Sequence, residues 1–519
     1  MPDMAGAAAG RRSAGVQDLN WLQPAERHAV SEPPNRYWEY GVGHAMRFKR
    51  FNGPSGRCAL APTREPNERL RKVIGETKLS GDAIARLVRR VAAEHDELLE
   101  TNKSSITHWK NGGQPAGNVG AFLAEALGRA LGGRVVTLEE IGLIAPAPRK
   151  PDWDADTLSA LAELGRTDVD VERRRALGVA VYSVAALSLP GEDWWQRMAE
   201  RGSARSSAAT RRVGPGDLAA VRDMTTLFSQ VDQRRGGGHA WTSVVQYLAT
   251  DVTAYLRGKF TDERVRRDLF SAASELAYLA GWMAFDGGQH ATAQRYFAEA
   301  VKLAAEAGDP PMAAHVLRAM AHQAIDLGHH QQALNLAAAS VDGDRYALAS
   351  PRERALLGVV HARSLAAAGR KNAAAKALLR AEDDLSAASE DIAEPDRVFF
   401  FGEASLAHET ACALRDIGDL DGSVREFHHS VRTRKATKFT RTHAVTLGYL
   451  GSVYAQMNNI DRACATWSQA LDAMDGVRSG RTRQAAADMR TLLSPYRRRG
   501  TAAISEIDAR AAVYLSETA

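Results

Sequence analysis

Apolar residues follow helical spacing along this chain from residue 66 onward. Leu70, Val73 and Ile74 form a first stripe, and Pro66 lies where a first helical turn tolerates proline. A second stripe follows Ser80, an expected N-cap, and comprises Ile84, Leu87, Val88 and Val91. We therefore expect two amphipathic helices at the start of the regular part of the chain.

A third, short helix is predicted over residues 103–111. Thr101 or Asn102 can cap it, and the glycine pair that follows can end it with a positive φ angle. Ile106 and Trp109 lie three positions apart and form its inner face. The other side chains are cationic or hydrogen-bonding: Lys103, Ser104, Ser105, Thr107, His108, Lys110 and Asn111. Because such side chains contact base edges and phosphates, the pattern predicts the recognition helix of a helix-turn-helix.

Three arginines, Arg86, Arg89 and Arg90, lie on the polar side of the second helix. They can contact DNA phosphates or form an ordinary solvated surface, since a phosphate contact requires only positive charge and exposure. Residues 92–100 separate the second and third helices, where a standard motif has a turn of three or four residues. This insertion is acidic, so we expect it to point away from DNA.

Two further helices are predicted after the third. Residues 121–131 repeat apolar side chains at helical spacing, and residues 137–143 begin with a capping box. Five short helices within residues 66–145, the third held by Ile106 and Trp109, resemble the phage-repressor-like (XRE) DNA-binding domain. The resemblance implies a helix-turn-helix fold and binding to double-stranded DNA.

The segments on either side of this domain lack such periodicity. Residues 1–65 are rich in Ala, Gly, Arg and Pro, and we expect a largely disordered extension. Its aromatic and basic residues between 37 and 50 are either an arm that follows a DNA groove or a stretch without function. Residues 146–216 are expected to form a linker with one or two helices, Pro-rich at its start and flexible at its end.

Residues 217–519 contain an internal repeat. A helix-breaking residue is followed by a small residue five positions later, a gap-filling residue after nine and another small residue after twelve. The frame begins at Gly288, Gly328, Gly369, Gly418 and Asn458. It is typical of the turn and second helix of a tetratricopeptide repeat (TPR), so we expect an all-α chain that ends in a TPR-like α-solenoid. A degenerate helical pair at about 217–260 is expected to precede the repeats.

The first helix of each repeat should line the concave face of such a solenoid. The candidate ligand-binding residues on this face are aromatic or basic: Tyr278, Trp282, Phe285, His315, Arg318, His322, Arg363, His408 and Arg415. They suit an extended peptide or an acidic segment of a partner protein. Alternatively, they pack against neighbouring repeats or against the second subunit of a dimer.

Composition and charge narrow the classes of function. The net charge of +5 and the pI of about 9.0 permit DNA binding without requiring it. Cys58, Cys412 and Cys464 are far apart, which favours a reducing compartment over a disulfide framework or a zinc site. The apolar runs are too short for a membrane span. We therefore expect a cytoplasmic protein.

Catalytic chemistry is not predicted. The glycine-rich stretch at residues 234–240 lacks the Lys-Ser/Thr of a phosphate-binding loop, so we expect a flexible turn between helices, with His239 a possible hydrogen-bonding residue. The histidine pairs lack the spacing of a zinc hydrolase, and the sequence offers no nucleophile with a partnered base. We expect no cofactor and no metal.

Short segments between Asp217 and Gly328 resemble a family of actinobacterial regulators. They are Leu227-Phe228, Arg235-Gly236-Gly237-Gly238-His239-Ala240, Ala280-Gly281-Trp282-Met283-Ala284-Phe285-Asp286 and His322-Gln323-Ala324. Members of this family join an N-terminal helix-turn-helix to TPR repeats, and the nearest group is that of the NsdA-like negative regulators of differentiation and antibiotic production. The resemblance implies a cytoplasmic transcription factor, commonly a repressor.

These observations together predict a homodimeric, sequence-specific DNA-binding repressor that is modulated by a peptide or protein bound to its TPR-like domain. Peptide-pheromone-responsive regulators are similar to it in domain order. A different class of function, an interaction scaffold without specific DNA binding, is the alternative. The salt dependence of binding to random duplex DNA separates the two, because a head that contacts phosphates must show it.

Overall fold

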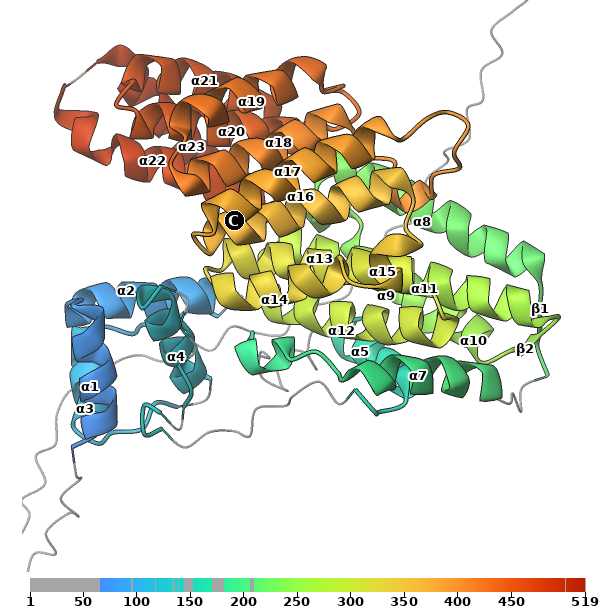
Figure 1. The fold of residues 1–519 in the computed structure, drawn as a ribbon. Coiled ribbons are helices and arrows are strands. Elements are labelled where there is room, and N and C mark those ends of the chain that lie inside the picture. Colours follow the sequence, from blue (N-terminus) through green and yellow to red (C-terminus); the bar gives the residue numbers. More distant parts are fainter. Residues whose placement is uncertain are drawn as a thin grey trace, which may run out of the picture. The chain divides into compact units, whose positions relative to one another are not determined.

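Helices make up nearly all of the regular structure in the computed structural model of the chain (Figure 1). It describes residues 66–518 apart from 95–96, 117, 133, 135, 139, 144–152, 170–181, 206–209 and 500. The expected N-terminal extension, residues 1–65, and the Pro-rich run lie outside the described residues. The all-α class is confirmed, because the described strands are β1 (Arg212–Val213) and β2 (Lys259–Phe260), a short parallel pair.

The first helices form a small domain, which we call the head. They are α1 (Glu68–Thr77), α2 (Gly81–Ala93), α3 (Lys103–Lys110) and α4 (Val119–Ala130). Their apolar faces enclose a core that includes Leu70, Ile84 and Phe122. Ser80 caps α2 as predicted, because its hydroxyl accepts the Ala83 amide at 3.2 Å. Asn67 caps α1, so Pro66 precedes the cap instead of occupying the first helical position.

The predicted fifth helix of the head is absent among the described residues, and positions 138 and 140–142 form turns. The cap itself is present, since Thr137 accepts the amide of Glu140 at 3.0 Å. Gly142, however, has a φ of 64°, and the Asn67 side chain donates to the carbonyl of Ile141 at 2.8 Å. The positive φ of Gly142 is incompatible with a continuing helix. Ile141 and Leu143 are therefore buried in the core from a turn.

The described residues between 153 and 204 pack into the C-terminal part, whereas we expected a linker with one or two helices. Helices α5 (Thr157–Val169) and α7 (Glu192–Ala204), with the 3-10 turn η1 (Val184–Leu187) between them, place Leu158 and Trp194 in the same core as the later helices. Gly202 permits this packing, because a Cβ there would lie 2.3 Å from the carbonyl oxygen of Glu306. Composition alone did not predict it, since these helices contact α12 and Thr157 donates to Glu306, which is 149 positions away.

The remaining helices stack as hairpins (Figure 1). An opening group consists of α8 (Pro215–Arg235), η2 (Gly237–His239), α9 (Trp241–Tyr247), the π-helical η3 (Leu248–Val252) and α10 (Thr253–Leu256). The hairpins are α11 (Glu263–Asp286) with α12 (His290–Ala307), α13 (Pro310–Asp326) with α14 (His330–Ser340), α16 (Pro351–Ala367) with α17 (Lys371–Ser386), α18 (Glu403–Ile417) with α19 (Leu420–Thr433) and α20 (Thr440–Gln456) with α21 (Ile460–Ala473). The other elements are α15 (Asp344–Ala347), η4 (Asp396–Val398), α22 (Gly480–Leu493), η5 (Ser494–Arg499) and α23 (Ala502–Glu517).

The repeated frame has the predicted local geometry in each hairpin. The residues that open it, Gly288, Gly328, Gly369, Gly418 and Asn458, all have positive φ angles. The residues five, nine and twelve positions later are buried in every case. Each turn therefore needs a residue that tolerates the left-handed region, and each second helix approaches its partner through small side chains.

The opening group also contacts the last helices of the stack. Arg441 of α20 forms ion pairs with Asp232 of α8 at 3.0 Å and with Asp286 of α11 at 2.7 Å. The glycine-rich stretch packs into this junction and is not the flexible turn that we expected, because a Cβ at Gly236 would lie 2.3 Å from the carbonyl of Arg478. These contacts join helices that are far apart in sequence, and they enclose a cavity between them.

Candidate functional site

The polar face of α3 is exposed in the structure, as predicted from its spacing. Lys103, Ser104, Thr107 and His108 are exposed, and together with Asn111 they line a shallow hollow. On the opposite side Ile106 and Trp109 are buried, with 2% and 6% of their surface accessible. The two apolar residues therefore hold the helix against the head while the polar residues face outward.

The ends of α3 are built as its sequence predicts. Asn102 is the N-cap, and its side chain accepts the backbone amide of Ser105 at 3.1 Å while the Ser105 hydroxyl accepts the amide of Asn102. Gly112 has a φ of 88° and ends the helix. Gly113 lies under the imidazole of His108, because a Cβ there would come within 2.3 Å of the ring. These contacts fix where the exposed side chains begin and end.

Some residues predicted to contact DNA also have partners within the protein. Asn111 accepts a hydrogen bond at 2.8 Å from Arg71, a residue of α1 that sequence reasoning missed. Arg89 donates to the carbonyl of Thr101 at 3.0 Å and so connects α2 to the start of α3. Arg86 and Arg90 are exposed. Lys110 and Ser105 are partly exposed.

The acidic insertion between α2 and α3 is held by α4. Arg129 pairs with Glu94 at 2.8 Å and with Glu125 at 2.9 Å. Glu125 also accepts a hydrogen bond at 2.9 Å from His329, at the start of α14. Burial opposes the ionisation of Glu125, but the hydrogen bond with His329 and the charge of Arg129 outweigh it and lower the pKa of this carboxyl. These acidic groups are thus neutralised within the protein.

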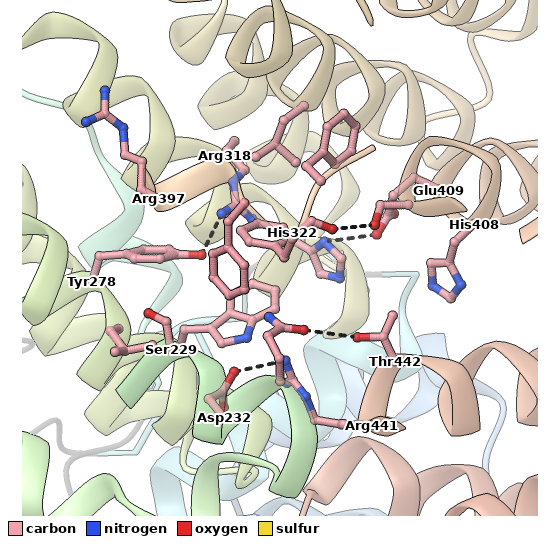
Figure 2. Close-up of a pocket in the computed structure, with 18 of the residues that line it drawn as sticks. Ser229, Asp232, Tyr278, Arg318, His322, Arg397, His408, Glu409, Arg441 and Thr442 are labelled. Atoms are coloured by element: carbon pink, nitrogen blue, oxygen red, sulfur yellow. Dashed lines mark hydrogen bonds and ion pairs between the residues drawn. The ribbon is translucent and has the colours of Figure 1, made fainter. Parts of the chain in front are cut away.

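A second candidate site is the cavity between the opening group and the hairpins (Figure 2). It contains about 900 Å³ of space, part of which is open to solvent. Its lining comes from α8, α11, α13, α16, α18, α20 and α22 and from the segment around η4. The first helices of the hairpins therefore face inward, as the repeat predicts. They surround a cavity beside the ion pairs of Arg441, where we expected an extended groove.

Five of the nine residues predicted for the concave face line this cavity: Tyr278, Trp282, Arg318, His322 and His408. The other four lie in the packing around it. Phe285 and His315 are buried beside aromatic neighbours. Arg363 is buried and pairs with Asp326 at 2.8 Å and Glu409 at 3.1 Å. Arg415 pairs with Asp416 at 2.8 Å. Sequence spacing thus identified the helix faces but not which side chains reach the cavity.

Sequence reasoning missed the arginines that lie outside the repeat frame. Arg397, Arg434, Arg441 and Arg481 all line the cavity, and Figure 2 shows Arg397 and Arg441 among the labelled side chains. Arg397 lies in η4, Arg434 at the end of α19, and Arg441 and Arg481 at helix starts, so helical spacing did not connect them with the first helices.

The histidines of the cavity are neutral at ordinary pH. Burial is the main cause that lowers the pKa of His322 and of His408 well below the usual value, and the charges of nearby arginines lower it further. The Nε2 atom of His322 lies 3.1 Å from the guanidinium of Arg363 and can accept its hydrogen bond. The basic character of the cavity therefore comes from guanidinium groups alone.

Residues 70–144 match a protein family described as the SP15 N-terminal domain. The match covers α1 to α4 and the turn that follows, so it coincides with the head and leaves the hairpins outside. No curated protein matches the chain. Within the described part of the chain, no helix combines the length and the apolarity that crossing a membrane requires.

Proposed function

We propose that the chain is a sequence-specific, DNA-binding transcriptional regulator, most simply a repressor, and that α3 is its recognition helix. The observation that supports this most strongly is the exposed polar face of α3 over a buried Ile106 and Trp109. A major groove about 12 Å wide admits a helix, and lysine, serine, threonine and histidine side chains can donate to base edges and phosphates there.

The hairpin stack is the sensing and dimerising part in this proposal. Two heads held by a symmetric dimer would reach successive major grooves about 34 Å apart on one face of the duplex. An effector in the solenoid would change operator affinity only as far as it binds the two arrangements of the dimer differently. The same arrangement is expected of cytoplasmic XRE regulators with TPR repeats, which the sequence resembles.

The first experiment selects sequences from a random duplex pool with the full-length protein and then footprints the selected site. Replacing Lys103, Ser104 and His108 by alanine should abolish the footprint and leave the far-ultraviolet circular dichroism unchanged, because these side chains are exposed. The matched control replaces Lys371, Asn372 and Lys376, exposed residues of α17. An unchanged footprint in the α3 variant would refute the recognition-helix assignment.

The salt dependence of binding to random duplex DNA separates the regulator from a scaffold. For the regulator, the logarithm of the affinity should fall linearly with the logarithm of salt concentration, and Lys103→Ala should reduce the slope by about 1 if that lysine contacts a phosphate. Absence of any salt-dependent binding, together with no enrichment in the selection, would favour an interaction scaffold.

A further inference from the structure

Three of the cavity arginines have no acidic partner. Arg318, Arg434 and Arg481, which we call the arginine cluster, form no ion pair within the described residues. Arg318 instead donates to the hydroxyl of Tyr278 at 2.6 Å and lies 3.0 Å from His315. Arg434 donates to the carbonyl of Ala404 at 2.8 Å and to the hydroxyl of Ser430 at 3.0 Å. No described carboxylate thus lies within ion-pair distance of these three guanidinium groups, although the more distant Asp326, Glu409 and Asp286 raise the pKa of Arg481.

Several N–H groups of the cluster also lack a hydrogen-bond acceptor in the protein. They are the Nε groups of Arg318, Arg434 and Arg481 and the Nη2 group of Arg481. Arg318 and Arg434 are only 2% and 8% exposed. Buried donors without acceptors cost free energy, and a buried cation without a counter-charge costs more. Two buried guanidinium groups and the partly exposed Arg481 therefore offer N–H groups, without an ion-pair partner, to the same cavity.

Two other arginines near the cavity, unlike those of the cluster, form ion pairs with carboxylates. Arg441 lies between two buried carboxylates, Asp232 and Asp286, and Arg363 lies between Asp326 and Glu409. The carboxylates that line the cavity are thus already used by other cations. The remaining one, Glu275, has its pKa raised to about 7 by burial and is only partly ionised at neutral pH. Burial also lowers the pKa of Arg434 to about 10, because the charge of Glu409 offsets the desolvation only in part.

The apolar part of the lining lies beside the cluster. The guanidinium of Arg318 lies 5.4 Å from the ring centres of Tyr278 and Trp282 and 6.0 Å from that of Phe400. Leu279, Leu356 and Val360 complete an apolar wall. An occupant that satisfies the cluster with one end would therefore place its other end against aromatic and aliphatic side chains.

We propose that this cavity binds a small organic anion, in which a phosphate or carboxylate group is held by Arg318, Arg434 and Arg481 and a flat apolar body packs on Tyr278, Trp282 and Phe400. Guanidinium groups favour such acids because their planar N–H groups match two oxygens at once. The occupant differs from the extended peptide expected from sequence.

The position of the cluster makes the anion a candidate effector. Arg318 is in α13, Arg434 follows α19 and Arg481 is in α22, so one bound anion would link helices from the middle and the end of the stack. A role in controlling operator affinity rests on the proposed function. Binding of the anion does not, and it is therefore tested on the full chain without DNA.

The test measures thermal unfolding of the full-length protein with phenyl phosphate, against sodium chloride of equal ionic strength. Phenyl phosphate should raise the midpoint by about 2 °C or more, since a ligand that binds the folded state alone stabilises it. Inorganic phosphate should raise it less because it lacks the flat body, and benzyl alcohol should not raise it. Arg434→Gln should abolish the phenyl phosphate shift, while Arg432→Gln, an exposed neighbour in α19, should retain it.

A second measurement distinguishes ligand binding from a structural role of the cluster. Without ligand, Arg434→Gln and Arg481→Gln should both unfold near the midpoint of the parent protein, because neither substitution breaks an ion pair. Marked destabilisation of both variants would show that the arginines serve the fold and would overturn the proposal. The proposal would also be overturned if the phenyl phosphate shift survived both substitutions, or if neither phosphate nor phenyl phosphate produced a shift. A shift produced only by a glutamate-rich peptide would overturn it as well. Loss of DNA binding in the α3 variant would leave all these results unaffected.

Discussion

The head and the cavity place their cationic side chains in opposite surroundings. Lys103 and His108 of α3 are exposed, so their replacement should cost the fold little. Arg318, Arg434 and Arg441 are buried, so each needs a partner. The comparison indicates that variants of the α3 face change binding with little effect on stability, whereas the effect of a cavity variant depends on whether its arginine is paired.

The largest effect is expected where a paired cavity arginine is removed. Arg441→Met leaves Asp232 and Asp286 buried without their shared counter-charge. The loss should be about 3–5 kcal/mol, as for other buried pairs from which one partner is deleted. Urea unfolding followed by circular dichroism measures it, and Arg432→Met should stay within about 0.5 kcal/mol of the parent protein.

A loss below about 1 kcal/mol for Arg441→Met would contradict the difference between buried and exposed cations, because cavity charges would then behave like surface charges. It would also mean that the junction between the opening group and the last hairpins does not depend on this ion pair.

Within the head, a similar contrast is expected between the two faces of α3. Ile106→Ala removes a buried anchor and should cost about 2–5 kcal/mol of stability. Thr107→Ala, at the adjacent exposed position, should change stability by less than about 0.5 kcal/mol. Hydrogen exchange of the α3 amides measures both. Equal protection in the two variants would contradict the division of this helix into an anchoring face and a binding face.

The smallest effect concerns the charge of Glu275 in the cavity. Its folded-state pKa is raised from 4.5 to about 7 by burial, so ionisation opposes folding and stability falls as pH rises between these values. Glu275→Gln removes this penalty. It should be more stable than the parent protein at pH 8, by roughly 1–3 kcal/mol, and the difference should nearly vanish near pH 4.5.

The matched control for this pH profile is Glu390→Gln, at an exposed position, which should follow the parent protein at every pH. A Glu275→Gln profile parallel to that of the parent protein would show that the carboxyl is solvated and would weaken the contrast between cavity and surface. Phenyl phosphate should also bind Glu275→Gln more tightly than the parent protein at pH 8, since the substitution removes one negative charge from the anion site.

The parts of the structure that sequence predicted are those set by near neighbours. The cap, the apolar pair and the glycine stop of α3 lie within about a dozen residues of one another, and all are as predicted. The hairpin frame is equally local. The predictions that differ from the structure concern elements set by contacts between distant residues. Asn67 donates to the carbonyls of Ile141 and Gly142, where a fifth head helix was predicted, and α12 packs on α5 and α7.

By itself, then, the sequence determined an all-α chain, a short helix with one polar face and a stack of helical hairpins, because caps, turn glycines and side-chain periodicity act over a few residues. Tertiary structure alone decided which arginines are paired. Arg441 reaches carboxylates 155 and 209 positions away, and the arginine cluster reaches none. Charge compensation in a buried cavity depends on residues that only the folded stack brings together. No local sequence pattern therefore shows which cations remain without an ion pair and can bind a ligand.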